Sequence, residues 1–207
     1  TGVGGHHLLW APVPSWFKVI AVAESIGMIL PVVAFMMNIY LTMRGNWNRF
    51  VTSIPLRFVV TGWAAYILVS YQGSHQAMRS INLITHFTQY VPAHAHLSLL
   101  FFAASTLMGG LYYAIPRIFK CQIFSRKLAN VGYGFYVIGF VFFFTGFVLT
   151  GLVQGTNWLH QGLPIWSVLP GLRPYMAMRA SGGVLVVLGF VVFSYNILAT
   201  ALVKSAS

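Results

Sequence analysis

The chain has almost no acidic residues: Glu24 is the only side-chain carboxylate among 207 residues, against 12 lysines and arginines. Charged residues make up 6% of the sequence and hydrophobic residues 58%. A soluble globule of this size needs far more polar residues to cover its surface, so this composition excludes the soluble class. The net charge of +11 does not indicate nucleic-acid binding, because the basic residues fall in short loops between apolar runs, where they set membrane topology.

Cysteine and targeting signals are also scarce. Cys121 is the only cysteine, so no internal disulfide can form. The chain begins at Thr1, with neither an initiator methionine nor a signal-peptide pattern. We interpret residues 1–207 as a single membrane domain that forms part of a larger unit.

What the sequence has is long apolar runs, and a run of about 20 residues can cross a bilayer core as a helix. The expected fold class is therefore all-α: a polytopic membrane helical bundle of about five transmembrane helices. Pro31 is expected to kink the first span, and the Trp-, Pro- and Gly-rich stretch 154–174 is expected to be irregular. The five expected spans are residues 17–43, 58–71, 94–115, 131–153 and 177–203.

The basic residues divide between the two ends of this bundle. One end is expected to hold Arg44, Arg49, Arg57, Arg117, Lys120, Arg126, Lys127 and Lys204, and the other Lys18, Arg79, Arg173 and Arg179. The end with more basic residues is expected in the cytoplasm. The opposite, outer end then holds all the histidines: His6, His7, His75, His86, His94, His96 and His160.

Two of these histidines, His94 and His96, stand two positions apart at the start of an apolar run. Each residue turns a helix by about 100°, so their side chains point about 200° apart. They cannot chelate one metal together, but each can reach a separate planar group such as a haem on its own side of the helix. The simpler alternative is that both are satisfied by polar groups on neighbouring helices.

The other candidates are a histidine pair and two arginines. Neutral imidazole is a common ligand of haem iron and copper, so His6 and His7 could converge on one copper if a third ligand comes from elsewhere. Arg79 and Arg179 suit haem propionates, which arginine binds through two hydrogen bonds. Alternatively, each arginine only marks the membrane boundary.

These residues together resemble subunit I of the haem–copper oxidase superfamily, first the C-type (cbb-type) cytochrome c oxidases and then the nitric oxide reductases. The likeness covers essentially the whole chain and corresponds to about the last five of the family's twelve core helices. Its most specific motif is His94-x-His96 with Asn82 and His86 upstream. The supporting motifs are Gly5-His6-His7-Leu8 with Pro14-x-Trp16, Gln72-Gly73, Leu152-Val-Gln154-Gly155-x-x-Trp158, and Tyr175-x-x-x-Arg179-Ala-x-Gly182-Gly183.

The resemblance implies a role for each site residue. His94 would be the proximal ligand of a high-spin haem, and His96 an axial ligand of a low-spin haem, expected to be b-type. His6 and His7 would hold the active-site copper. The residues expected in the propionate region are Arg79, Asn82, His86 and Arg179.

The chain departs from the C-type pattern at two acids. The family carries a glutamate where this chain has Gln72 and an aspartate where it has Gln89. Those acids bear on the propionate region, on a bound calcium and, in the reductases, on proton delivery, so the part that the two acids play in these three features does not carry over to this chain. The second low-spin haem ligand, the third copper ligand and the redox tyrosine would all lie upstream of Thr1.

The chain is therefore expected to form part of the catalytic subunit of a respiratory terminal oxidase. Such an enzyme reduces dioxygen to water and is coupled to electron and proton transport. The expected setting is the cytoplasmic membrane of a bacterium or archaeon, beside c-type cytochrome subunits or another electron donor. Three alternatives remain open: a nitric oxide reductase, a non-catalytic haem-bearing electron-transfer subunit, and a transporter or channel without haem. A reductase would call for a carboxylate ligand, for which Glu24 is the only candidate.

Overall fold

A computed structural model describes residues 3–205 of the chain, and the side chains of residues 4–202. Within that range the structure is helical and contains no strand, as expected. Its elements are η1 (Val3–Leu8), α1 (Ser15–Gly27), α2 (Ile29–Met43), α3 (Arg49–Thr52), α4 (Ile54–Ala77), α5 (Arg79–Thr85), α6 (Tyr90–His96), the π-helical η2 (Leu97–Ala103), α7 (Ala104–Ile118), α8 (Arg126–Gln161) and α9 (Ile165–Ser205).

Five helical stretches of the described residues are long and apolar enough to cross a membrane, which confirms the expected number of spans. The third of them is composite, because α6, η2 and α7 follow one another without a break. Each stretch has more than the roughly 20 residues that a bilayer core requires. The five are Ser15–Met43, Ile54–Ala77, Tyr90–Ile118, Arg126–Gln161 and Ile165–Leu202.

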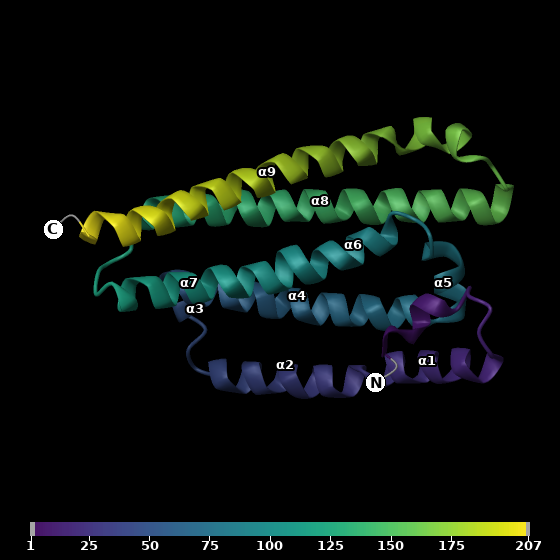
Figure 1. The fold of residues 1–207 in the computed structure, drawn as a ribbon, viewed down its shortest axis with the longest axis horizontal. Helices are drawn as coiled ribbons and strands as arrows, with labels where there is room; N and C mark the ends of the chain where they lie inside the picture. The colour runs from purple at the N-terminus through teal and green to yellow at the C-terminus, as the bar shows by residue number, and fades with distance from the viewer. Residues whose placement is uncertain (1–2, 206–207) are drawn as a thin grey trace.

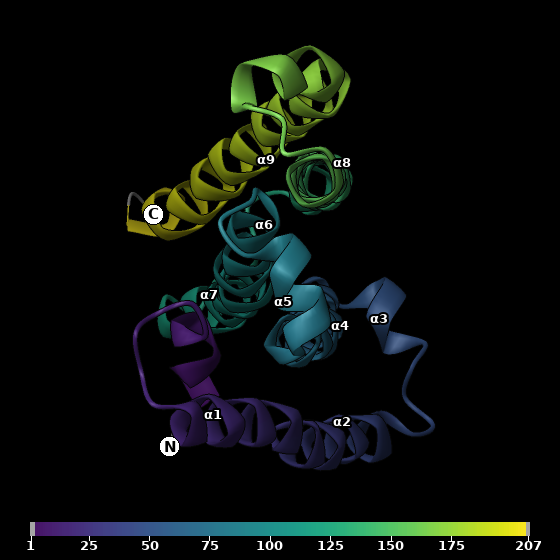
Figure 2. The same ribbon diagram turned by 90° about the vertical axis from the view of Figure 1, so that its right-hand side faces the viewer.

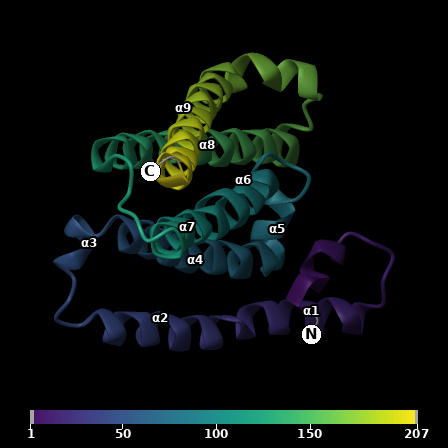
Figure 3. The ribbon, with the colours of Figure 1, turned by 60° about the vertical axis from the view of Figure 1, so that its left-hand side comes forward.

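The spans lie side by side in three layers (Figure 1). α8 and α9 form one layer, α4 with α6 and α7 forms the middle one, and α1 with α2 forms the third, which the end-on view of Figure 2 separates clearly. Figure 3 shows the α1–α2 layer running along the bundle next to α4. The middle layer is therefore covered on both sides, and η1 and α5 close one end of the bundle.

The first span is interrupted at Met28, where α1 ends and α2 begins. Pro31 explains the position of this break, because proline has no N–H for the carbonyl one turn earlier and its ring crowds that carbonyl. The expected effect of Pro31 is thus seen as a local interruption of the helix.

The stretch 154–174, expected to be irregular, is mostly helical, so that expectation is wrong. α8 continues to Gln161 and α9 already begins at Ile165. Gly162 ends α8 in the left-handed conformation, with φ of 58°, which glycine adopts without strain. Pro170 and Pro174 lie inside α9, as membrane helices allow when neighbouring groups satisfy the freed carbonyls.

The basic residues divide between the ends of the bundle as expected. α2, α3 and α7 end, and α8 begins, at one end, whereas η1, α5 and the C-terminal end of α8 lie at the other (Figure 1). The segments that carry the histidines all belong to this second end. The side chain of Lys204 lies outside the described part of the chain.

Candidate functional site

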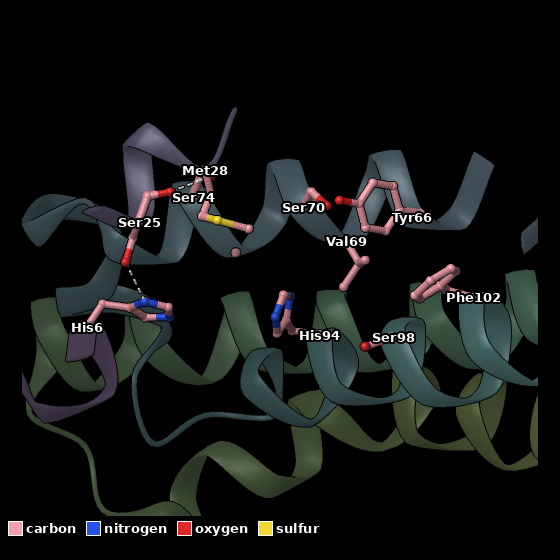
Figure 4. A pocket seen from close by; sticks show the side chains of 11 residues that line it. His6, Ser25, Met28, Tyr66, Val69, Ser70, Ser74, His94, Ser98 and Phe102 are labelled. Carbon is pink, nitrogen blue, oxygen red and sulfur yellow. Dashed lines mark hydrogen bonds between the residues drawn. The ribbon is translucent and has the colours of Figure 1, made fainter. Parts of the chain in front are cut away.

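A cavity of about 240 Å³ lies between α1, α4 and α6 at the histidine-rich end of the bundle. His6 stands on one side of it and His94 on another, and hydroxyl groups from α1 and α4 line much of the rest (Figure 4). The backbone at Gly73 lies against the His94 ring, since a Cβ added there would stand 3.0 Å from His94 Cε1. A side chain at position 73 would therefore push against the His94 imidazole.

The His6 ring is buried and held by hydroxyl groups. Ser25 Oγ donates its hydrogen to the Ala21 carbonyl oxygen at 2.7 Å, so at 2.9 Å from His6 Nδ1 it accepts the Nδ1–H. Ser74 Oγ of α4 in turn donates to the Ser25 carbonyl oxygen at 2.9 Å. This network ties η1, α1 and α4 together and places the lone pair of a neutral His6 on Nε2, the nitrogen through which His6 would bind a metal.

His7 is exposed beside His6, with the two ring centroids 4.3 Å apart and the ring planes tilted by 36°. His86, between α5 and α6, faces the same region: burial lowers its pKa, and the nearby His7 charge lowers the pKa further. Both effects favour neutral imidazole at His86. Three histidine side chains from two distant segments thus lie at this end.

His96 points to the other side of its helix, toward α8. Its ring stacks on Phe147 at 5.1 Å and meets the edge of Phe143 at 5.2 Å. His96 Nδ1 donates to the Pro92 carbonyl oxygen at 2.7 Å, which leaves the Nε2 lone pair free for a ligand bond. The opposite orientation of His94 and His96, predicted from their spacing, is therefore observed.

Arg179 of α9 completes the surroundings of His96. Its guanidinium lies 4.7 Å from the centroid of Phe147, the ring that stacks on His96. Arg179 Nη1 also donates to Gln89 Oε1 at 2.9 Å, and Gln89 N donates to Gln154 Oε1 at 3.1 Å. A cation, an aromatic ring and an imidazole are thus stacked between α6, α8 and α9.

The remaining predicted residues gather around Trp10 of the N-terminal segment. Trp10 Nε1 donates to Asn82 Oδ1 at 2.7 Å, and its ring stacks on His86 with centroids 6.2 Å apart. A cavity of about 350 Å³ adjoins them, lined in part by Lys18, Arg79 and Asn82. Arg79, Asn82 and His86 therefore lie together around Trp10, whereas Arg179 lies beside Phe147 and His96.

The histidines and polar side chains at this end fit the two haems and the copper ion that the sequence resemblance implies, with one restriction. His94 Nδ1 and Gln72 Oε1 are both buried without a hydrogen-bond partner among the described residues, and buried polar atoms of this kind fit a position next to a bound group. The described residues contain no group of three His, Cys, Asp or Glu side chains close enough to hold a metal ion. His6 and His7 can therefore supply only part of a copper site.

Sequence reasoning missed Ser25, Trp10 and Phe147. Ser25 and Phe147 look like ordinary members of apolar helices, and their partners lie far away along the chain. Trp10 had a weak signal, because it directly follows the histidine-bearing segment. His75 and His160, by contrast, take no part in the two cavities: His75 Nε2 lies 3.2 Å from Tyr71 Oη, and His160 is exposed.

The comparisons with known proteins agree with one another. A family model described as "Cytochrome C and Quinol oxidase polypeptide I" matches residues 1–185. The cbb3-type cytochrome c oxidase subunit CcoN1 of Stutzerimonas stutzeri is 28% identical over 200 residues, which cover 93% of this chain and 42% of that protein. A cytochrome c oxidase subunit 1 homolog of Agrobacterium tumefaciens (strain T37) is 26% identical over 206 residues, or 96% of this chain and 38% of that protein.

A solved structure, a heme-copper terminal oxidase dimer studied by cryo-EM, has the same fold over 97% of this chain and 39% of its own, with a TM-score of 0.79 at 21% identity. The chain thus spans about two fifths of the length of the relatives it matches.

Proposed function

This chain belongs to the cytochrome c and quinol oxidase polypeptide I family, and we propose on that basis that it is the C-terminal part of the catalytic subunit of a respiratory haem–copper terminal oxidase. The proposed reaction is the four-electron reduction of dioxygen to water. The observation that carries the proposal is the opposite orientation of His94 and His96 on one helix, with His6 facing the same cavity as His94.

Each imidazole has a distinct task in this proposal. His94 would hold the iron of a high-spin haem, His96 the iron of a low-spin haem, and His6 with His7 a copper ion. These cofactors, when bound, supply the redox chemistry. Ser25 and the Pro92 carbonyl orient His6 and His96 through their Nδ1 atoms, so that each ring presents Nε2.

The polar groups around these histidines would bind the propionates. Arg79 beside Asn82 and His86 offers one cationic region, and Arg179 above Phe147 offers another. Two separate regions suit two haems on opposite faces of one helix. Gln72 and Gln89 are neutral amides, so neither supplies the carboxylate that a calcium ion prefers.

The rest of the catalytic subunit, joined to this chain or carried by a companion membrane chain, would supply the second low-spin haem ligand, the third copper ligand and a redox tyrosine. Electrons would come from c-type cytochrome subunits or another donor. The basic end is proposed to face the cytoplasm of a bacterium or archaeon, so the histidine-rich end faces outward.

Nitric oxide reduction is a weaker proposal, because it calls for a carboxylate on the second metal. Glu24 is exposed on α1 and does not line the cavity between His6 and His94. Elemental analysis distinguishes a copper site from an iron site. Loss of copper from a His7→Ala complex supports the oxidase, whereas iron in that position supports the reductase.

The test is an optical difference spectrum, reduced plus carbon monoxide minus reduced, of the complete complex. His94→Ala should abolish the carbon monoxide shift and leave the low-spin band, because only the first haem loses its ligand. His96→Ala should remove the low-spin band. An unchanged carbon monoxide spectrum in His94→Ala would overturn the assignment.

His75→Ala is the matched control, since His75 lies at the same end but outside both cavities. Its spectrum should equal that of the unmodified complex. A loss of the carbon monoxide shift in this control would show that the spectrum reports general damage to this end and not ligation by His94.

A further inference from the structure

The only side-chain carboxylate of the chain lies inside the first membrane-spanning stretch. Glu24 is the tenth residue of Ser15–Met43, so it stands roughly 14 Å along the helix from the histidine-rich end. This stretch of 29 residues is longer than a bilayer core of about 30 Å by only a few residues at each end, so Glu24 falls within the hydrocarbon region. Its side chain is exposed. A carboxylate that faces lipid at this depth is costly, so Glu24 calls for a polar neighbour.

The three faces of this span carry different kinds of side chain. Helical bonding continues across the interruption at Met28, because Met28 N donates to the Glu24 carbonyl oxygen and Val32 N donates to the Met28 carbonyl oxygen. One face is buried against the bundle and holds Ala21, Ser25, Val32 and Met43. A second face is exposed and holds the large apolar side chains of Ile26, Leu30, Val33 and Met37. The third is exposed and holds small or polar residues, and we call it the Glu24 face: Glu24, Gly27, Pro31, Ala34 and Asn38.

The two exposed faces suit different neighbours. Large apolar side chains suit lipid, whereas small residues let the backbone of another helix approach closely and polar residues bond across the contact. A Cβ added at Gly27 would meet nothing within 4 Å, so a helix can approach the backbone at that point. The Glu24 face therefore has the composition of a helix–helix interface in a membrane.

Two oxygen groups on the Glu24 face need hydrogen-bond donors. One is the Glu24 carboxylate. The other is the Gly27 carbonyl, because Pro31 stands four positions further on and has no N–H to donate to it. Lys18 is the nearest basic residue along the chain, but it lies about 120° away around the helix and lines the cavity beside Trp10. A cationic side chain from a neighbouring helix offers both the charge and the donors that these two oxygen groups lack.

The Glu24 face adjoins the site that the proposed function leaves incomplete. Ser25 and Met28 each follow a residue of the Glu24 face, and both line the cavity between His6 and His94 (Figure 4). The α1–α2 layer lies at the edge of the bundle, so a further helix can stand beside it (Figure 2). The matched relatives are more than twice as long as the region that this chain covers, so their remaining length can supply such a helix.

We propose that the Glu24 face docks a transmembrane helix of the rest of the catalytic subunit, and that this helix presents a lysine or arginine to the Glu24 carboxylate. The origin of the helix rests on the proposed function. The need for a cation rests on Glu24 itself, because a charge buried without its partner is strongly destabilising. The ion pair fixes the register of the docked helix next to the segment that holds Ser25.

Photo-crosslinking in the complete membrane complex identifies the neighbour of this face. Benzoylphenylalanine in place of Ala34 should react with a transmembrane helix from outside residues 1–207, and that helix should carry a lysine or arginine at the depth of Glu24. The matched control replaces Val33, which is 45% exposed on the large apolar face, and should react with lipid. Reaction of the Ala34 probe with lipid, with residues 1–207, with another subunit, or with a helix that has no basic side chain would overturn the proposal.

Charge substitutions test the ion pair in the same complex. Glu24→Lys places two cations together and should lower the melting temperature by about 5 °C, and Glu24→Gln should lower it by less. Changing the cross-linked basic residue to glutamate should restore the melting temperature of Glu24→Lys, because the pair is then only reversed. An unchanged melting temperature in Glu24→Lys, or no recovery in the double variant, would rule the pair out.

The proposed function is tested separately by the carbon monoxide spectrum of His94→Ala. An unchanged spectrum there, together with a cross-linked basic helix at Ala34, would contradict the proposed function and leave the docked helix in place. A lost carbon monoxide shift in His94→Ala, together with lipid at Ala34, would do the reverse.

Discussion

At the scale of single residues, His6 and His96 of the candidate site share one feature: Nδ1 of each ring is engaged in a hydrogen bond. Ser25 Oγ accepts from His6 Nδ1, and the Pro92 carbonyl accepts from His96 Nδ1. In both rings the proton is held on one nitrogen and the lone pair is left on the other. A ligand histidine fixed in this way binds metal better than one whose ring must first be ordered.

Ser25 is therefore predicted to support metal binding without touching the metal. Ser25→Ala removes the acceptor of His6 Nδ1 and should lower copper affinity by about 10- to 100-fold. Ser25→Thr keeps a hydroxyl and should keep most of the copper. Elemental analysis of the complex after dialysis against a chelator measures the difference.

Thr42→Ala is the control for this pair of variants. Thr42 lies on the same span and makes a similar bond, from Oγ1 to the Asn38 carbonyl oxygen, but far from the cavity. It should retain the copper of the unmodified complex. If Ser25→Ala also retains it, the hydroxyl does not hold His6 for a metal.

At the scale of helices, the contact between α8 and α9 is made by glycines spaced seven residues apart on each helix. A Cβ at Gly139 would lie 2.6 Å from Leu185 Cβ, and one at Gly146 would lie 2.6 Å from Arg179 N. A Cβ at Gly189 of α9 would lie 2.9 Å from Tyr136 Cβ. Close approach of this kind stabilises helix pairs in membranes through packing of their backbones. It also positions Arg179 over Phe147, and so supports the side of the site that carries His96.

Gly146→Val is predicted to separate the two helices at this point. The added side chain meets the Arg179 backbone and should destabilise the domain by about 1–3 kcal/mol, as overpacking does. Thermal unfolding of the purified complex measures the loss. The low-spin haem band should weaken more than the carbon monoxide shift, because His96 and not His94 lies beside α8.

Gly134→Val gives the matched comparison, since a Cβ at Gly134 of α8 meets nothing within 4 Å. Its melting temperature should stay close to that of the unmodified complex. Equal melting temperatures for both variants would mean that α8 and α9 are not held at this distance by glycine.

At the scale of the whole molecule, the two ends of the bundle have different chemistry. The histidines, the cavity between His6 and His94, and the Trp10 cluster lie at one end, and most of the basic residues lie at the other. The α1–α2 layer is the least buried of the five spans, so much of its surface is left for lipid or for other helices. The separation of charge between the ends predicts the orientation of the chain in the membrane.

Cys121 provides a direct measure of this orientation, because it is the only cysteine and lies in the basic loop between α7 and α8. A membrane-impermeant maleimide should label it in inside-out vesicles and leave it unlabelled in intact cells. A Gln161→Cys variant in a Cys121→Ala background should show the opposite pattern, since Gln161 is exposed at the other end of α8. Labelling of Cys121 from outside the cell would reverse the proposed orientation.

The sequence by itself determined the number of spans and the opposite orientation of His94 and His96. Both follow from local regularities: the length of an apolar run and the fixed turn of a helix per residue. The same local reasoning failed for residues 154–174, where tryptophan, proline and glycine indicated an irregular segment but the helices extend through most of it. Proline and glycine break isolated helices, and a packed bundle can compensate for them.

Only the tertiary structure decided which side chains meet at the site. Ser25 reaches His6 from 19 residues away, and Trp10 reaches Asn82 from 72 residues away. The tertiary structure also places Arg179 and Arg79 in different parts of the site, whereas the sequence analysis assigns both to one propionate region. Periodicity fixes the direction of a side chain relative to its own helix, but the partner it meets depends on how the helices pack, and that is set by non-local contacts such as the glycines of α8 and α9.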